Sequence, residues 1–251
     1  MHLPAEALNG SICPVTAAVT AAVLSGAGYA LYKSVKNKTN STVSPVRFLG
    51  VGAVIFALQM VNFPILSGVS GHFVGGVLAA AALGLPCGML CMAAVLALQA
   101  FLLGDGGVDA LGANILNMGI IGAGLGGLIR LLLIKTGLNS AFSTALAASS
   151  ALILAVFALC TELAFCGKGS WEVYSALIGN HLLLAVTEGV FTVVLCSALQ
   201  GLYAPQESSA ADRRFAFAAG AIVLLAVLLL PLASSSPDGL EWTIDKFKLL
   251  G

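Results

Sequence analysis

Long uncharged hydrophobic runs, separated by short polar segments, dominate the pattern along this chain. A membrane-spanning helix needs about 20 apolar residues. The runs are continuous and do not alternate between apolar and polar positions, which favours helices over a β-barrel. The pattern therefore predicts an all-α integral membrane protein with about eight transmembrane helices. The predicted spans are residues 12–32, 47–66, 72–85, 87–103, 110–133, 142–165, 173–201 and 215–233.

Residues 72–103 are the ambiguous part of this assignment, because they are long for one span and short for two. The distribution of basic residues favours two helices with a turn at Leu85–Pro86. Lysine and arginine collect in cytoplasmic loops, and this split puts the main basic clusters on one side of the membrane and the N-terminus outside. The clustered basic residues are Lys33, Lys36, Lys38, Arg47, Arg130, Lys135, Arg213 and Arg214.

The composition agrees with a membrane protein and excludes other classes. Hydrophobic residues make up 59% of the chain and charged residues only 9%, whereas a soluble domain is about 25% charged. The 11 basic and 11 acidic residues cancel without forming a block of like charge, so we expect no nucleic-acid partner. The six cysteines form no CxxC pair, and the N-terminus lacks the basic region of a signal peptide.

Polar residues inside hydrophobic runs are candidates for function, because they are costly in a membrane. His181 and Glu188 lie two helical turns apart and therefore share one helix face. We interpret them as a structural hydrogen-bonded pair, with a role in a coupling route as the alternative.

A histidine at position 2 gives the chain the atoms of a metal chelate. The Met1 amine and the amide nitrogen between Met1 and His2 close a five-membered ring with a metal, and this amide and the His2 Nδ1 close a six-membered ring. Three nearly coplanar nitrogens suit Ni(II) or Cu(II). His72, on the same predicted side and after a loop of small residues, is the candidate fourth ligand. From the residues alone, an ordinary surface or buried imidazole remains the commoner explanation.

Several motifs resemble the NikM/CbiM family, the substrate-binding membrane subunits of nickel/cobalt energy-coupling-factor transporters. The resemblance covers about residues 1–203. The segments that carry it are Met1-His2-Leu3-Pro4, Asn62-Phe63-Pro64-Ile65, Ser70-Gly71-His72, Gly75-Gly76, Gly104-Asp105-Gly106-Gly107 and the stretch from Leu111 to Gly119.

A second resemblance lies near the C-terminus. The stretch from Pro237 to Glu241 is similar to the PDGLE motif of the NikN/CbiN-type accessory subunit, so the chain resembles a fused NikMN protein with a partial accessory segment. We therefore expect a metal-binding membrane domain at residues 1–203, a cytoplasmic linker at 204–214, and an accessory helix with the PDGLE segment at 215–251.

The resemblance implies a receptor that binds Ni(II), or alternatively Co(II), at the outer face of a prokaryotic cell membrane. Its metal ligands carry over to Met1, His2 and His72. Asn114 and Asn117 match polar positions that would hold the His72 ring and the N-terminal segment, with helix packing as the alternative. We place nickel before cobalt because a planar four-nitrogen site favours it.

The resemblance also implies partners. A transmembrane coupling subunit of the NikQ/CbiQ type and ATPases of the NikO/CbiO type would drive transport, with a further small accessory subunit as an additional partner. Small residues on the first span allow close helix contact with the coupling subunit, or with this protein itself. They are Ala17, Ala18, Ala21 and Ala22.

Other functions have less support in the sequence. The chain contains no Walker-type loop, so ATP hydrolysis belongs to partner proteins. An enzyme would need a nucleophile–base pair or an HExxH motif, which we do not find. A cobalt-specific homologue that feeds cobalamin synthesis, or a stand-alone secondary metal permease, remains as an alternative.

Overall fold

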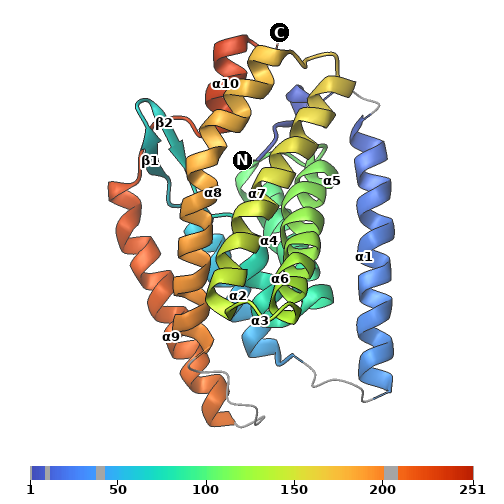
Figure 1. Ribbon diagram of the computed structural model, residues 1–251, viewed down its shortest axis with the longest axis vertical. Coiled ribbons are helices and arrows are strands. Elements are labelled where there is room, and N and C mark those ends of the chain that lie inside the picture. The colour runs from blue at the N-terminus through green and yellow to red at the C-terminus, as the bar shows by residue number, and fades with distance from the viewer. Residues whose placement is uncertain (1, 9–11, 38–42, 201–208, 251) are drawn as a thin grey trace.

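The computed structural model describes residues 2–8, 12–37, 43–200 and 209–250, which form a bundle of helices with one two-stranded hairpin (Figure 1). The α-helices are α1 (Ile12–Lys36), α2 (Pro45–Gln59), α3 (Gly76–Leu83), α4 (Leu85–Leu98), α5 (Leu111–Asn114), α6 (Gly126–Lys135), α7 (Ser140–Phe165), α8 (Trp171–Gln200), α9 (Ser209–Leu229) and α10 (Gly239–Phe247). The 3₁₀ segments are η1 (Ala5–Ala7) and η4 (Leu230–Leu232), the π-helical segments are η2 (Gln99–Leu103) and η3 (Ile115–Leu125), and the strands are β1 (Phe63–Leu66) and β2 (Val69–Gly71).

Six helical stretches in the described part of the chain are long and apolar enough to cross a membrane. Two of them include a π-helical segment, as where α4 continues into η2. They span Ile12–Lys36, Leu85–Leu103, Leu111–Lys135, Ser140–Phe165, Trp171–Leu199 and Ala210–Leu232.

The other two expected spans correspond to shorter helices. The α2 helix has 15 residues and α3 has eight, which gives lengths of about 22 and 12 Å against a bilayer core of about 30 Å. The chain leaves the helix after Gln59 to enter β1, and Gly84, with a left-handed φ of 81°, separates α3 from α4. The expected break is thus present one residue before Leu85, but eight spans are not confirmed.

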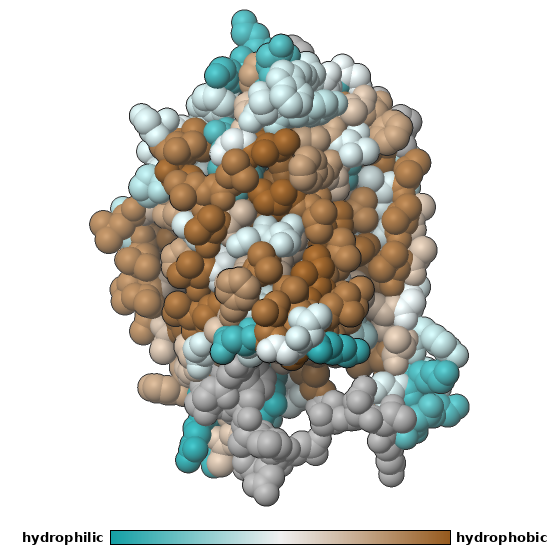
Figure 2. All heavy atoms as spheres, in the orientation of Figure 1, coloured by the Kyte–Doolittle hydropathy of each residue, from teal (hydrophilic) through white to brown (hydrophobic). Residues whose placement is uncertain are grey.

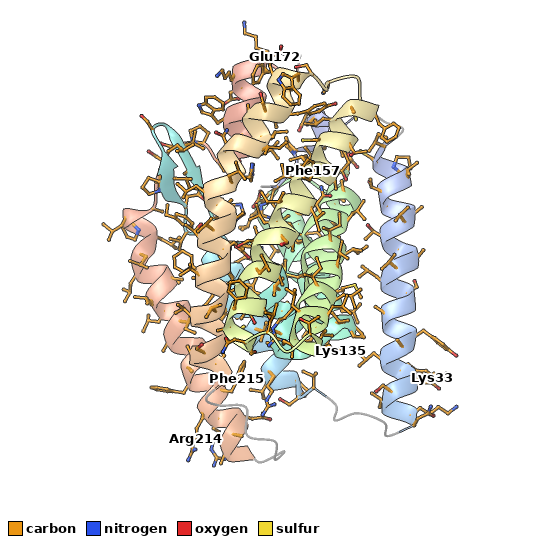
Figure 3. All side chains as sticks on the ribbon, viewed as in Figure 1. Lys33, Lys135, Phe157, Glu172, Arg214 and Phe215 are labelled. Atoms are coloured by element: carbon orange, nitrogen blue, oxygen red, sulfur yellow. The ribbon has the colours of Figure 1, made fainter. Side chains whose placement is uncertain are left out.

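The polar and apolar surfaces are divided along the bundle. Hydrophobic side chains cover the middle of the visible face, and polar side chains gather toward its two ends (Figure 2). Lys33, Lys135 and Arg214 all lie at one end, whereas Glu172 lies at the other (Figure 3). These basic groups therefore share one end of the bundle, as the positive-inside pattern requires.

Small residues allow the helices to approach closely. A Cβ atom added to Gly76 of α3 would lie 2.6 Å from the carbonyl carbon of Gly122 in η3. One added to Gly50 of α2 would lie 2.7 Å from the fully buried ring of Phe215 in α9. Van der Waals contact of this kind is the main cause of helix association in lipid, and here it joins α9 to the rest of the bundle.

The β1–β2 hairpin and α10 lie together at the end of the bundle opposite the basic groups (Figure 1). Gly68, with φ of 75°, forms the turn between the two antiparallel strands. Asp238 is the N-cap of α10 and forms a capping box with Glu241. The Asp238 side chain accepts a hydrogen bond from the Glu241 amide, and the Glu241 side chain accepts one from the Asp238 amide. Ser70 of β2 pairs with Asp238 in an isolated β-bridge, so the hairpin and the C-terminal segment are directly connected.

Candidate metal centre

The N-terminal segment is fixed to the bundle through its main chain. The Leu3 amide donates to Asn114 Oδ1 at 2.8 Å, and Asn114 Nδ2 donates back to the Leu3 carbonyl at 3.1 Å. The loop before α5 leaves room for this contact because Gly106 has no side chain: a Cβ there would lie 2.4 Å from Asn114 Nδ2, and its φ is 73°. The Asn114 clamp thereby sets the position of the neighbouring His2.

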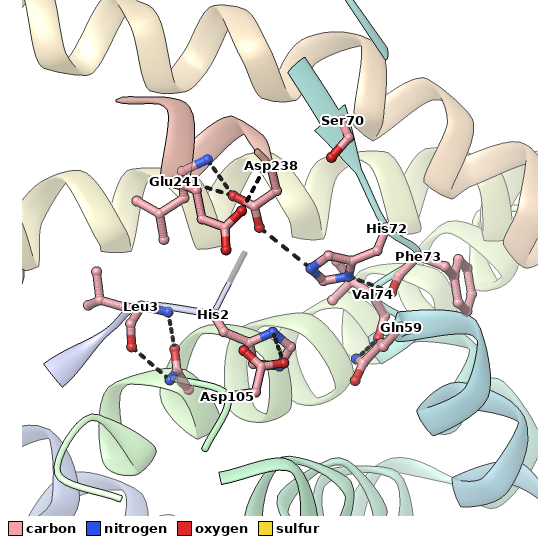
Figure 4. A network of polar contacts seen from close by, with 12 residues as sticks. His2, Leu3, Gln59, Ser70, His72, Phe73, Val74, Asp105, Asp238 and Glu241 are labelled. Atoms are coloured by element: carbon pink, nitrogen blue, oxygen red, sulfur yellow. Dashed lines mark hydrogen bonds and ion pairs between the residues drawn. The ribbon is translucent and has the colours of Figure 1, made fainter. Parts of the chain in front are cut away.

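His2 and His72 come together although 70 positions separate them in the sequence. Their rings are stacked with 5.5 Å between centroids and 20° between planes (Figure 4). Both side chains are buried, with 9% and 5% of each residue exposed. Met1, the other expected ligand, lies outside the described residues.

A chain of side-chain amides determines which nitrogen of His2 carries the proton. Gln59 Nε2 donates to the Val74 carbonyl at 2.7 Å, and Gln99 Nε2 donates to Gln59 Oε1 at 2.8 Å. Gln99 Oε1 therefore faces His2 Nε2, at 3.2 Å, as an acceptor. His2 Nε2 must donate this bond, which leaves the lone pair of the ring on Nδ1.

The His72 ring is oriented by its own backbone. Its Nδ1 lies 3.1 Å from the carbonyl of Phe73. Because a carbonyl only accepts, Nδ1 carries the proton and Nε2 carries the lone pair. A hydrogen bond donated by one ring nitrogen, which fixes the tautomer and the ring orientation, is the usual arrangement of a metal-binding histidine.

Each of these lone-pair nitrogens faces a carboxylate. His2 Nδ1 lies 3.2 Å from Asp105 Oδ2, and His72 Nε2 lies 3.7 Å from Asp238 Oδ2. Burial lowers the pKa of His2 to about 4 and that of His72 to about 3, so both rings are neutral near pH 7. A neutral imidazole nitrogen and a carboxylate oxygen both present lone pairs, and a cation or proton between them makes this arrangement favourable.

Side chains alone do not make a closed metal site. Within the described residues, no group of three or more His, Cys, Asp and Glu residues is arranged to hold a metal ion. Main-chain nitrogen, which Ni(II) and Cu(II) accept in planar geometry, is a further class of ligand beside His2 and His72.

The loop that carries His72 is held from inside the bundle by Glu188. Its two oxygens accept from the amides of Val74 at 2.9 Å and Gly75 at 2.8 Å. The His181 ring instead donates through Nδ1 to the Leu177 carbonyl at 2.7 Å. The expected His181–Glu188 hydrogen bond is thus wrong, because seven residues along a helix are about 10 Å of rise.

Asn117, another expected residue, pairs with a residue outside the candidate centre. Asn117 Nδ2 donates to Glu162 Oε2 at 2.9 Å, and the expected contact with the His72 ring or the N-terminal segment is not formed. The π-helical turn that begins at Ile115 places Asn117 toward α7, where Glu162 lies.

The alanines of α1 are largely exposed along the helix. A Cβ added to Gly112 of α5 would lie 2.5 Å from the Ala17 backbone nitrogen, so α1 packs closely on α5 at this point. Thr20 strengthens this contact by donating to the Gly112 carbonyl at 2.8 Å. The exposed alanines are Ala17, Ala18, Ala21 and Ala22.

Sequence reasoning missed four residues at this centre. Gln59 and Gln99 stood out only as polar residues in apolar runs, and Asp105 only as part of a glycine-rich motif. Asp238 stood out as part of the PDGLE stretch, without a role in metal binding. For Gln59 and Gln99 the available signal was a polar side chain in an apolar run, but this signal does not identify the partner.

Known proteins resemble this chain in sequence. Residues 2–206 match the family described as CbiM, cobalt uptake substrate-specific transmembrane region. An Archaeoglobus fulgidus protein named as a fused nickel transport protein, NikMN, is 42% identical over 105 residues, which are 42% of this chain and 33% of that protein. A protein of Haloquadratum walsbyi named as a metal transport protein is 36% identical over 146 residues, which are 57% of this chain and 66% of that protein. The matched segments span less than two thirds of either relative.

Solved structures also resemble this chain in fold. A truncated transition metal transporter has a TM-score of 0.68 and 29% identity, over 80% of this chain and 99% of that chain. A second transition metal transporter has a TM-score of 0.68 and 28% identity, over 80% of this chain and 93% of that chain. From its sequence match and its membrane-spanning helices, this chain belongs to the CbiM family, described as the cobalt uptake substrate-specific transmembrane region, and is a multi-pass membrane protein.

Proposed function

We propose that this chain is the receptor subunit of an ATP-driven transporter and binds Ni(II) through Met1, His2 and His72. The observation that carries the proposal is the stacked pair of buried, neutral imidazoles, whose lone pairs lie on His2 Nδ1 and His72 Nε2. The chelate requires Nδ1 of His2, and a neutral ring nitrogen of His72 can supply the fourth ligand. The Met1 amine and the amide nitrogen of His2 would supply the other two positions of a planar site.

The orientation of the bundle in the membrane is inferred from its basic residues. Lys33, Lys135 and Arg214 lie at the end of the bundle away from α10, and such residues favour the cytoplasmic side. The histidine pair and the N-terminus would then face the outside of a prokaryotic cell, where the receptor meets its substrate. In this orientation the expected linker at residues 204–214, between the domains at 1–203 and 215–251, would lie on the cytoplasmic side.

The energy for transport would come from partner proteins. A coupling subunit of the NikQ/CbiQ type and ATPases of the NikO/CbiO type would form the complete transporter, with a further accessory subunit as an additional partner. The exposed alanines of α1, among them Ala18 and Ala22, form a face on which a coupling helix could pack closely.

Metal analysis of the purified, untagged protein is the direct test. We expect one Ni(II) per chain with the absorption spectrum of a square-planar ion. His72→Ala should abolish most of the binding, whereas His181→Ala, which removes another buried imidazole, should leave it unchanged. A residue added before Met1, or acetylation of its amine, should also abolish binding, since both alter a ligand. An extended protein that bound Ni(II) with unchanged affinity would refute the chelate.

Cobalt is the second candidate substrate, because the family description names cobalt uptake whereas the Archaeoglobus relative is named for nickel. Competition between Ni(II) and Co(II) for the purified protein distinguishes the two. Preference for Co(II) with a non-planar spectrum would favour a cobalt receptor that feeds cobalamin synthesis. Uptake that persists without partner ATPases would instead favour a stand-alone permease.

A further inference from the structure

The Asp238 side chain divides its two oxygens between different tasks. Its Oδ1 caps α10 by accepting from the amides of Leu240 at 2.8 Å and Glu241 at 2.9 Å. Its Oδ2 lies 3.7 Å from His72 Nε2, and the Asp238 and His72 side chains are only 10% and 6% exposed (Figure 4). One carboxylate oxygen therefore faces the metal ligand while the other keeps the helix in place.

The backbone around Asp238 is fixed independently of this charge. Ser70 donates through its amide to the Pro237 carbonyl at 2.8 Å and through its hydroxyl to the Ser236 carbonyl at 2.7 Å. Asn180 donates to the Gly239 carbonyl at 3.3 Å. Contacts from both β2 and α8 thus hold the segment beside His72, so its position does not depend on attraction between the carboxylate and the ring.

A bound divalent cation would need negative charge close to it. Imidazole and amine ligands are neutral, and one deprotonated amide leaves a net charge of +1 on the proposed chelate. A net charge buried away from water is costly unless it is paired. Asp105 also faces the centre, but its side chain is 33% exposed and its charge is partly screened by water. Asp238 is the buried carboxylate at this position.

We propose, on the basis of the function proposed above, that Asp238 supplies the negative charge that balances the bound metal ion. The 236–241 segment then contributes to the affinity of the receptor for divalent ions, in addition to attaching α10 to the hairpin. Asp238 acts as a positioning and charge-balancing residue beside the nitrogen ligands.

Asp238→Asn separates charge from structure, because asparagine is as good a helix N-cap as aspartate. We expect calorimetric titration of the purified full chain with Ni(II) to show binding weakened about 10- to 100-fold, the usual effect of changing a group that supports a metal ligand. The absorption bands of bound Ni(II) should keep their positions, because the nitrogen ligands are unchanged. Asp238→Glu should restore part of the affinity.

Asp245→Asn is the matched control. Asp245 lies on the same helix but is exposed, so the same loss of charge there should change the affinity by no more than about twofold. Ser70→Ala removes an attachment of the segment without removing the charge, and should have a smaller effect than Asp238→Asn.

The outcomes separate the two proposals. Wild-type affinity in Asp238→Asn, or an equal loss in Asp245→Asn, would overturn the role of Asp238 and leave the metal site intact. A loss in Asp238→Asn that Ser70→Ala reproduces in full would show a structural attachment only and would also overturn it. A wild-type protein that binds neither Ni(II) nor Co(II) would overturn the proposed function itself.

Discussion

Replacement of Gln99 by methionine tests whether the amide chain controls the His2 tautomer. Gln99 is completely buried and connects His2 with Gln59. Methionine has a similar length and flexibility but does not replace these hydrogen bonds. The substitution therefore removes the acceptor for His2 Nε2 while disturbing the packing around α4 and η2 very little.

The expected magnitude follows from the groups that lose their partners. His2 Nε2–H and Gln59 Oε1 both remain buried, and each unsatisfied group costs about 1–3 kcal/mol. The free energy of unfolding should therefore fall by about 2–6 kcal/mol. With the proton free to move to Nδ1, Ni(II) affinity should fall about 10- to 100-fold, which equals about 1.4–2.8 kcal/mol of binding free energy.

Calorimetric titration with Ni(II) and thermal unfolding of the purified protein measure these two effects separately. Gln59→Met tests the far end of the chain, because it breaks the bonds to Val74 and Gln99 and so removes the group that orients the Gln99 amide toward His2. It should lose comparable stability and part of the affinity. Wild-type affinity in Gln99→Met would refute the proposed control of the tautomer.

Three further predictions concern the surroundings of the centre. Asn114→Ala removes both hydrogen bonds to Leu3, so hydrogen exchange of residues 2–8 should rise and Ni(II) binding should weaken; unchanged exchange would contradict the clamp. Acidification from pH 6.5 to about 4 should reduce the stability of the metal-free protein, because burial lowers the pKa of His2 from 6.5 to about 4 and the unfolded chain takes up the proton first. Thermal unfolding across this range checks the sign. A His2→Gln variant should show a smaller dependence of stability on pH. In Gly76→Val the added Cβ would lie 2.6 Å from Gly122. The substitution should lower the unfolding temperature by several degrees, the equivalent of about 1–3 kcal/mol of stability. An unchanged unfolding temperature would show that α3 and η3 can separate freely.

Hydropathy identified the membrane-spanning helices well but not the short ones. Long apolar runs such as 142–165 correspond closely to α7 (Ser140–Phe165). The run 47–66 instead contains both α2 and the strand β1, because apolarity does not distinguish a helix from a short buried strand. The boundary between them depends on tertiary contacts, for example those of Gln59 with Val74.

The structure brings the expected His2 and His72 together and shows Asn114 holding the N-terminal segment as expected, whereas the glutamines and carboxylates beside the rings were not predicted. The chelate geometry and the family resemblance both pointed to His2 and His72. Glu188 was paired with the wrong group because a shared helix face was taken as contact, although the seven-residue spacing already implies about 10 Å of rise. Asp238 meets His72 across 166 positions of sequence, and such a contact follows only from how β2, α8 and α10 pack.

The proposed metal centre brings together residues that are synthesised at different times. His2 and Asp238 are 236 positions apart, which is roughly 12–47 s of synthesis at about 5–20 residues per second. During that time the N-terminal segment can find Gln99 and Asn114 but not the carboxylate of α10. The proposed centre can therefore be completed only after α10 has been synthesised, and a chain whose translation stalls before α10 would lack its buried carboxylate.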